Sequence, residues 1–151
     1  MSEYARTTRP TENRPTETGP ALLRPAVYFR ISGFALLAVA ILGLVMNLVE
    51  GNYSHALGLG NTFLNFTYAH DALHFVLAGA ALMFGFANIP GHVVKLFAIV
   101  FGFVYLALGI AGFFVFNAPH DTAFLALTPA LDIVHILLGG YALTAGFMAK
   151  Y

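Results

Sequence analysis

Two pairs of ionisable residues are the part of this sequence best suited to chemistry. Asp71 precedes His74 by three positions, and Asp132 precedes His135 by the same interval. Residues three apart are neighbours on a helix surface, so each pair would present a carboxylate beside an imidazole. Both pairs lie in strongly apolar stretches, where ionisable side chains are costly and usually have a function. These four residues are therefore the candidate site.

Metal binding is one interpretation of the two pairs. Two carboxylates and two imidazoles suit Zn²⁺, Fe²⁺ or Mn²⁺. The ligands would be Asp71, His74, Asp132 and His135. Further ligand candidates are His70, one turn before His74, and His120 or Asp121 in a later connection. A second interpretation is a b-type haem with His74 and His135 as axial ligands, although no Lys or Arg accompanies them to meet the propionates.

Two other interpretations need no cofactor. In a structural one, Asp71 bonds to His135 and Asp132 bonds to His74, which would satisfy all four polar groups and fix the helix ends in register. In the other, the pairs relay protons or bind a substrate, but no ionisable residue continues a path along the apolar segments. The sequence has no Gly-x-Ser-x-Gly elbow, no His-Glu-x-x-His helix and no phosphate-binding loop, so no catalytic residue is predicted.

Four long apolar segments must position these residues. Of the 151 residues, 59% are hydrophobic and 9% are charged, against about 25% charged in soluble domains. The segments are Ile31–Val49, Tyr68–Ala87, Val93–Phe116 and Ala130–Met148. Each approaches the ~20 residues that span a bilayer core as a helix, and backbone in lipid must bond internally. The sequence therefore predicts an all-α bundle of four transmembrane helices over residues 28–150, in contact with the lipid bilayer.

Charge and composition exclude several other classes of protein. Seven Lys and Arg balance seven Asp and Glu, which leaves no basic surplus for binding nucleic acid. The absence of cysteine excludes disulfides and thiolate metal sites. Residues 1–27 are rich in Pro, Thr, Glu and Arg, which predicts a disordered tail. All seven basic residues fall on one side of the four predicted spans, so both termini are expected in the cytoplasm of a bacterial cell, with the spans in its inner membrane.

An internal repeat relates the two halves of the chain. Phe63–Phe86 aligns without gaps on Phe124–Phe147, and the alignment superimposes both Asp/His pairs. The first and third segments match more weakly, through Gly43 against Gly109 and an Asn near each end. The chain therefore reads as two parallel-repeat hairpins, related by a pseudo-two-fold axis along the membrane normal. This predicts that the two pairs lie at one depth and face inward.

The residues around both pairs resemble a known family. The segments 69–79 and 131–140 carry an Asp-x-x-His motif followed by glycines. This is similar to the Asn/Asp-x-x-His-x3-4-Gly signature of small bacterial four-span membrane proteins in domain-of-unknown-function family 4383. The resemblance covers about residues 28–150 and implies a bacterial integral membrane protein, without implying an activity or an established site.

Two functions follow as hypotheses. The first is a non-catalytic accessory or assembly subunit that binds other membrane subunits or further copies of itself, because the chain is nearly all membrane span with short connections. The second is a metal- or haem-binding membrane protein that uses the paired Asp-x-x-His motifs.

Overall fold

Four long helices form the protein. The computed structural model describes residues 19–51, 54–55, 65–116, 125 and 127–150. Its helices are α1 (Pro25–Glu50), α2 (Tyr68–Phe86), α3 (Gly91–Ala111) and α4 (Pro129–Met148). A 3-10 turn, η1 (Ala21–Leu23), precedes α1, and a π-helical turn, η4 (Gly112–Phe116), continues α3. The segments β1 (Ser54–His55) and β2 (Asn65–Phe66) form a two-residue antiparallel pair between α1 and α2.

The four helices are long and apolar enough to cross a membrane, which confirms the predicted bundle of transmembrane helices. The chain is a small integral membrane protein. Helix α1 begins at Pro25, six residues before the predicted segment, because proline is favoured in the first helical turn and apolar residues follow it directly. Both η1 and the start of α1 thus lie within the range assigned to the tail, whose residues 1–18 are outside the described residues.

Equivalent threonines start α2 and α4. The Thr67 hydroxyl accepts a hydrogen bond from the backbone N–H of His70 at 3.1 Å, and the Thr128 hydroxyl accepts one from the N–H of Leu131 at 3.3 Å. A threonine in this position satisfies one of the free N–H groups of a helix N-terminus. The two caps place Asp71 and Asp132 at the same point of the first helical turn. We call the end of the bundle that carries both caps the histidine end.

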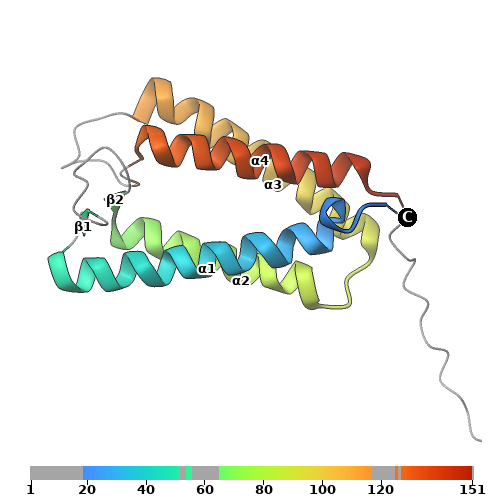
Figure 1. The fold of residues 1–151 in the computed structure, drawn as a ribbon, viewed down its shortest axis with the longest axis horizontal. Coiled ribbons are helices and arrows are strands. Elements are labelled where there is room, and N and C mark those ends of the chain that lie inside the picture. Colours follow the sequence, from blue (N-terminus) through green and yellow to red (C-terminus); the bar gives the residue numbers. More distant parts are fainter. Residues whose placement is uncertain (1–18, 52–53, 56–64, 117–124, 126, 151) are drawn as a thin grey trace, which may run out of the picture.

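The helices are arranged as two hairpins, α1 with α2 and α3 with α4 (Figure 1). Glycines bring the two helices of each hairpin together. A Cβ atom added to Gly33 would lie 3.1 Å from the Leu82 backbone nitrogen, and one added to Gly102 would lie 2.9 Å from that of Leu143. Six further glycines make similarly close approaches, each to a residue of its own hairpin: Gly43, Gly85, Gly109, Gly112, Gly139 and Gly146. Small residues at these positions allow the backbones to pack closely in lipid.

Both hairpins bury corresponding positions. Every buried residue of α2 has a buried counterpart in α4, 61 residues further along. Every buried residue of α3 has a buried counterpart in α1, 69 residues earlier. The close contacts follow the same spacing, since Gly43 meets Asp71 as Gly112 meets Asp132. Gly112 is therefore the packing counterpart of Gly43, and the alignment of Gly43 with Gly109 was wrong by three residues. The internal repeat itself stays a prediction.

Aromatic side chains join the two hairpins away from the histidine end. The rings of Tyr28 and Tyr141 are 5.0 Å apart, and those of Phe84 and Phe97 are 4.1 Å apart. Basic residues lie at the same end. The Arg30 side chain donates a hydrogen bond to the Gly85 carbonyl at 2.7 Å, and the Lys95 amine donates one to the Ala149 carbonyl at 2.9 Å. One end of the bundle thus holds a packed aromatic core and cations, whereas the other holds the candidate site.

Candidate metal centre

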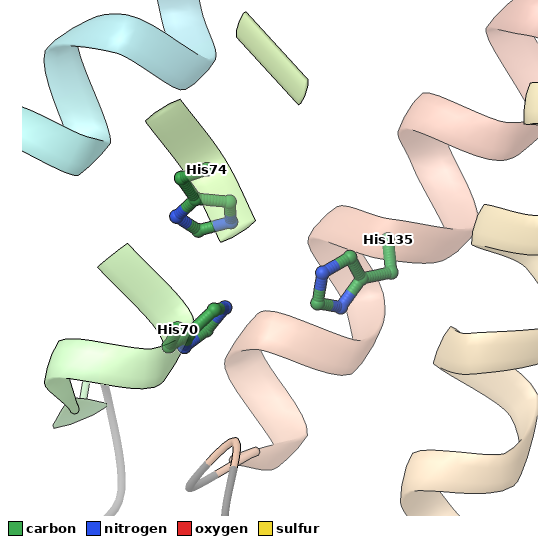
Figure 2. A group of neighbouring side chains, drawn as sticks. All are labelled: His70, His74 and His135. Carbon is green, nitrogen blue, oxygen red and sulfur yellow. The ribbon is translucent and has the colours of Figure 1, made fainter. Parts of the chain in front are cut away.

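Three histidines converge between the hairpins at the histidine end. His70 and His74 come from the first two turns of α2, and His135 comes from the second turn of α4. Figure 2 shows their side chains extending into the space between the two helices. One nitrogen from each imidazole lies within 4.8 Å of the others. His74 and His135 occupy corresponding positions of α2 and α4, in agreement with the spacing of the two motifs.

The cluster is buried, and one nitrogen of each ring has no geometrically well-formed hydrogen bond to a described residue. The exposed fractions of His70, His74 and His135 are 3%, 6% and 7%. The Nδ1 atom of each ring is buried without a hydrogen-bond partner. Buried polar atoms in proteins are nearly always satisfied by protein groups, ordered water or an ion, so these three nitrogens are the atoms of the cluster that are available to a ligand or to water. A cavity of about 40 Å³ lies among the three rings, and leucines and Tyr105 form the rest of its lining.

Asp71 does not belong to this cluster. Its carboxylate accepts a hydrogen bond from the Asn47 side-chain amide at 2.6 Å, and it packs against Gly43. Both partners are on α1, so Asp71 faces its own hairpin. Positions three apart on a helix differ by about 60° in direction. That angle directs His74 toward the other hairpin and Asp71 toward α1.

Asp132 likewise faces its own hairpin. Its carboxylate packs against Gly112 at the end of α3, and neither of its oxygens has a hydrogen-bond partner among the described residues. The side chain is fully buried. Asp132 therefore lies beside α3 as Asp71 lies beside α1, but without the amide that Asn47 supplies in the first hairpin. Asn117, which the sequence comparison matched with Asn47, lies outside the described residues.

These positions correct the predicted pairing across the bundle. Asp71 bonds to Asn47 instead of His135, and Asp132 has no bond to His74. The predicted metal ligands are also divided. Among the described residues, His74 and His135 come together with His70, which was a further candidate, while Asp71 and Asp132 are excluded from the ligand group. His120 and Asp121 lie outside the described residues.

The size of the cavity distinguishes the two cofactor interpretations. Pockets for cofactors and drug-sized molecules occupy roughly 300–1,000 Å³, whereas this cavity occupies about 40 Å³. A metal ion fits it and a porphyrin between His74 and His135 does not. In a tetrahedral zinc site, ligand nitrogens lie about 3.3 Å apart at the usual bond length. The three imidazole nitrogens lie within 4.8 Å of one another, so they would have to approach by about 1.5 Å at most to reach that spacing.

Tyr105 of α3 is a site residue that the sequence did not reveal. It is 2% exposed, its ring is 5.4 Å from that of His135, and its hydroxyl has no hydrogen-bond partner. A lone tyrosine within an apolar segment carries no pattern that would identify it. Its counterpart in α1, 69 residues earlier, is Leu36, so the hydroxyl is present in one hairpin only.

The fold and site define a class: an integral membrane protein of four helices with a buried cluster of three histidines between two hairpins. Comparisons do not narrow that class, since no family model, curated protein or solved structure matches the chain.

Proposed function

We propose that this protein binds a transition-metal ion through His70, His74 and His135. One observation carries the proposal: three buried imidazoles from two hairpins meet at a small cavity, and the Nδ1 atom of each has no protein partner. Neutral imidazole suits Zn²⁺, Cu²⁺, Fe²⁺ and Ni²⁺. Calcium and magnesium require oxygen ligands, which this cluster does not offer.

Three ligands leave a coordination position open. Structural zinc sites use four protein ligands, whereas catalytic sites use three and keep the fourth for water or substrate. Here the open position would face the cavity, where Tyr105 and leucine side chains form the remaining wall. A metal in this site is therefore suited to binding a small exogenous group. It would also link α2 to α4, and so hold the two hairpins together at the histidine end.

The membrane orientation is part of the proposal. The described basic residues Arg24, Arg30, Lys95 and Lys150 all belong to chain segments at the end opposite the histidines. The positive-inside rule then places this end in the cytoplasm and the metal near the outer face of a bacterial inner membrane. The resemblance to family 4383 implies a bacterial integral membrane protein and carries no orientation of its own.

The accessory-subunit hypothesis stays a prediction. Large apolar side chains are exposed on all four helices, and lipid accounts for them as well as partner subunits would. The metal site has a specific geometry in its support, so it is the function we propose. Co-purification of a stoichiometric membrane partner in mild detergent would support the accessory role independently.

Metal analysis of the purified full-length chain tests the proposal. We expect the metal-stripped protein to bind close to one equivalent of Co²⁺ or Zn²⁺, with a cobalt spectrum typical of tetrahedral nitrogen ligation. His74→Gln and His135→Gln should lose this binding, because two nitrogen ligands cannot replace three. His92→Gln is the matched control, since His92 is exposed at the start of α3. Helical circular dichroism checks that each variant is folded.

The stabilisation of the folded protein by bound metal gives a second measurement. Binding to the native state alone should raise the melting temperature of the wild-type protein and of the His92 variant, but not that of the two site variants. Failure of the stripped wild-type protein to bind Co²⁺, Zn²⁺, Cu²⁺ or Ni²⁺ would overturn the proposal. Equal binding by folded His74→Gln and wild-type protein would overturn it as well.

A further inference from the structure

We propose that an apolar groove between α2 and α3 takes a fatty acid from the membrane, with the acyl chain in the groove and the carboxylate in the histidine cavity. The position of the carboxylate rests on the proposed function, because the metal would bind it. The position of the chain rests on the groove alone.

The groove has the size and surface of an acyl-chain site. Its volume is about 320 Å³, and apolar side chains of α2 and α3 line almost all of it. Val100 and Val104 are half exposed on its rim, so the groove opens on the side of the bundle that faces lipid. An alkyl chain therefore reaches it from the bilayer without crossing water.

The groove adjoins the histidine cavity. Leu77, Tyr105 and Leu108 line both spaces. Tyr105 stands at their junction, and its buried hydroxyl has no partner. An unpaired buried hydroxyl is costly, and an acceptor oxygen on a bound molecule would satisfy it. A chain in the groove would place its polar head between this hydroxyl and the three histidines.

The cavity selects the head group. The cavity of about 40 Å³ has room for a few water-sized groups, since one water molecule needs roughly 10–15 Å³ of such a cavity. A carboxylate is small enough to enter, whereas a phosphodiester head group is not. The charge also favours a carboxylate, because a divalent cation held by three neutral imidazoles has no anionic ligand among the described residues.

A second groove provides an internal comparison. It lies between α1 and α4, occupies about 270 Å³ and is also apolar. Several of its residues are the 61- and 69-residue counterparts of the first groove, for example Ala35 for Val104 and Leu138 for Leu77. Its own tyrosine, Tyr141, already donates a hydrogen bond to the Leu22 carbonyl at 2.6 Å. This groove therefore has room for a chain but no free polar group for a head.

Photo-crosslinking of the full-length protein in lipid nanodiscs tests this assignment. The probe is a palmitic acid with a mid-chain diazirine, and labelled peptides are identified by mass spectrometry. We expect labelling in α2 and α3 along the groove, with competition by palmitate but not by hexadecane. Ala80→Phe, which fills the groove, should reduce this labelling at least fivefold. Ala35→Phe, which fills the second groove, is the matched control and should leave it unchanged.

The head-group contact is tested separately with Tyr105→Phe, which keeps the ring and removes the hydroxyl. We expect about tenfold more palmitate to be needed for half-maximal competition. Equal labelling of both grooves, or equal competition by hexadecane and palmitate, would overturn the proposal, because it would show ordinary lipid contact.

Metal-stripped and metal-loaded samples separate this inference from the proposed function. We expect palmitate to compete more strongly when metal is bound. Groove-specific, palmitate-sensitive labelling in a protein that binds no metal would retain the acyl-chain site and refute the metal. Normal metal binding without groove-specific labelling would retain the metal and refute the acyl-chain site.

Discussion

The two hairpins bury the same positions but make different use of them. Helices α2 and α4 correspond over all their buried residues, and both begin at a threonine cap. They differ where α2 has His70 and α4 has Leu131, and α1 and α3 differ where α1 has Leu36 and α3 has Tyr105. The identical histidines of the two motifs also belong to the candidate site. The site therefore combines two shared positions with two differing ones, and only the differing ones make it unequal between the hairpins.

The largest expected effect tests the shared packing. Gly33→Leu and Gly102→Leu should each lower the free energy of unfolding by about 3 kcal/mol, because the added side chain meets the backbone of the paired helix. Thermal unfolding in detergent, followed by circular dichroism, measures the change. Gly79→Leu and Gly140→Leu are matched controls, since nothing lies within 4 Å of a Cβ at either position. If only one of the two packed glycines proves sensitive, the hairpins are not equivalent.

The next effect concerns the polar pair of the first hairpin. Asn47→Leu should cost about 2 kcal/mol of stability, because it leaves the buried Asp71 carboxylate without its hydrogen-bond donor. The double variant with Asp71→Leu should recover part of this loss. Equal melting temperatures for the single and double variants would show that the two side chains are not coupled.

A smaller effect of opposite sign is expected in the second hairpin. Asp132→Asn should raise the free energy of unfolding by up to about 1 kcal/mol, since it replaces a buried ionisable group without a partner by a neutral group of the same shape. Chemical unfolding in mixed detergent micelles measures this difference. A clear loss of stability would contradict the absence of a partner and would make the two aspartates alike.

The smallest effect tests the difference between His70 and Leu131. Leu131→His adds an imidazole at the counterpart position in α4. We expect the metal to bind about threefold more tightly, or ~0.7 kcal/mol, because a fourth nitrogen replaces a weaker ligand at the open position. Competition with a chromophoric chelator gives the affinity. Weaker binding would indicate that Leu131 packs where an imidazole cannot reach the ion.

The sequence predicted the features that depend on regular spacing. Four apolar segments defined four helices, and the spacing of 61 residues placed His74 and His135 at corresponding positions. The direction of the aspartates could not be predicted in the same way. Two side chains that are three residues apart are able to contact the same neighbouring helix or two different helices. Which of these occurs depends on the room that Gly43 and Gly112 leave in the paired helix.

Tyr105, the polar site residue of α3, could not be predicted for a related reason. The alignment of the first and third segments relied on Gly43 and Gly109, three residues from the register that the contacts show. In that alignment Tyr105 falls opposite Val39 instead of Leu36. Helices rich in Gly, Leu and Ala align almost equally well in several registers, and only the packing against a second helix selects one.

The close glycine contacts have a consequence for biogenesis. All eight contacts join two helices of the same hairpin, and none joins one hairpin to the other. Each hairpin is therefore able to pack as soon as its second helix has been inserted into the membrane. Docking of the two finished halves is then a separate and later event. The three histidines come together only after the two hairpins dock. A bound metal ion would therefore stabilise correctly docked hairpins relative to undocked intermediates.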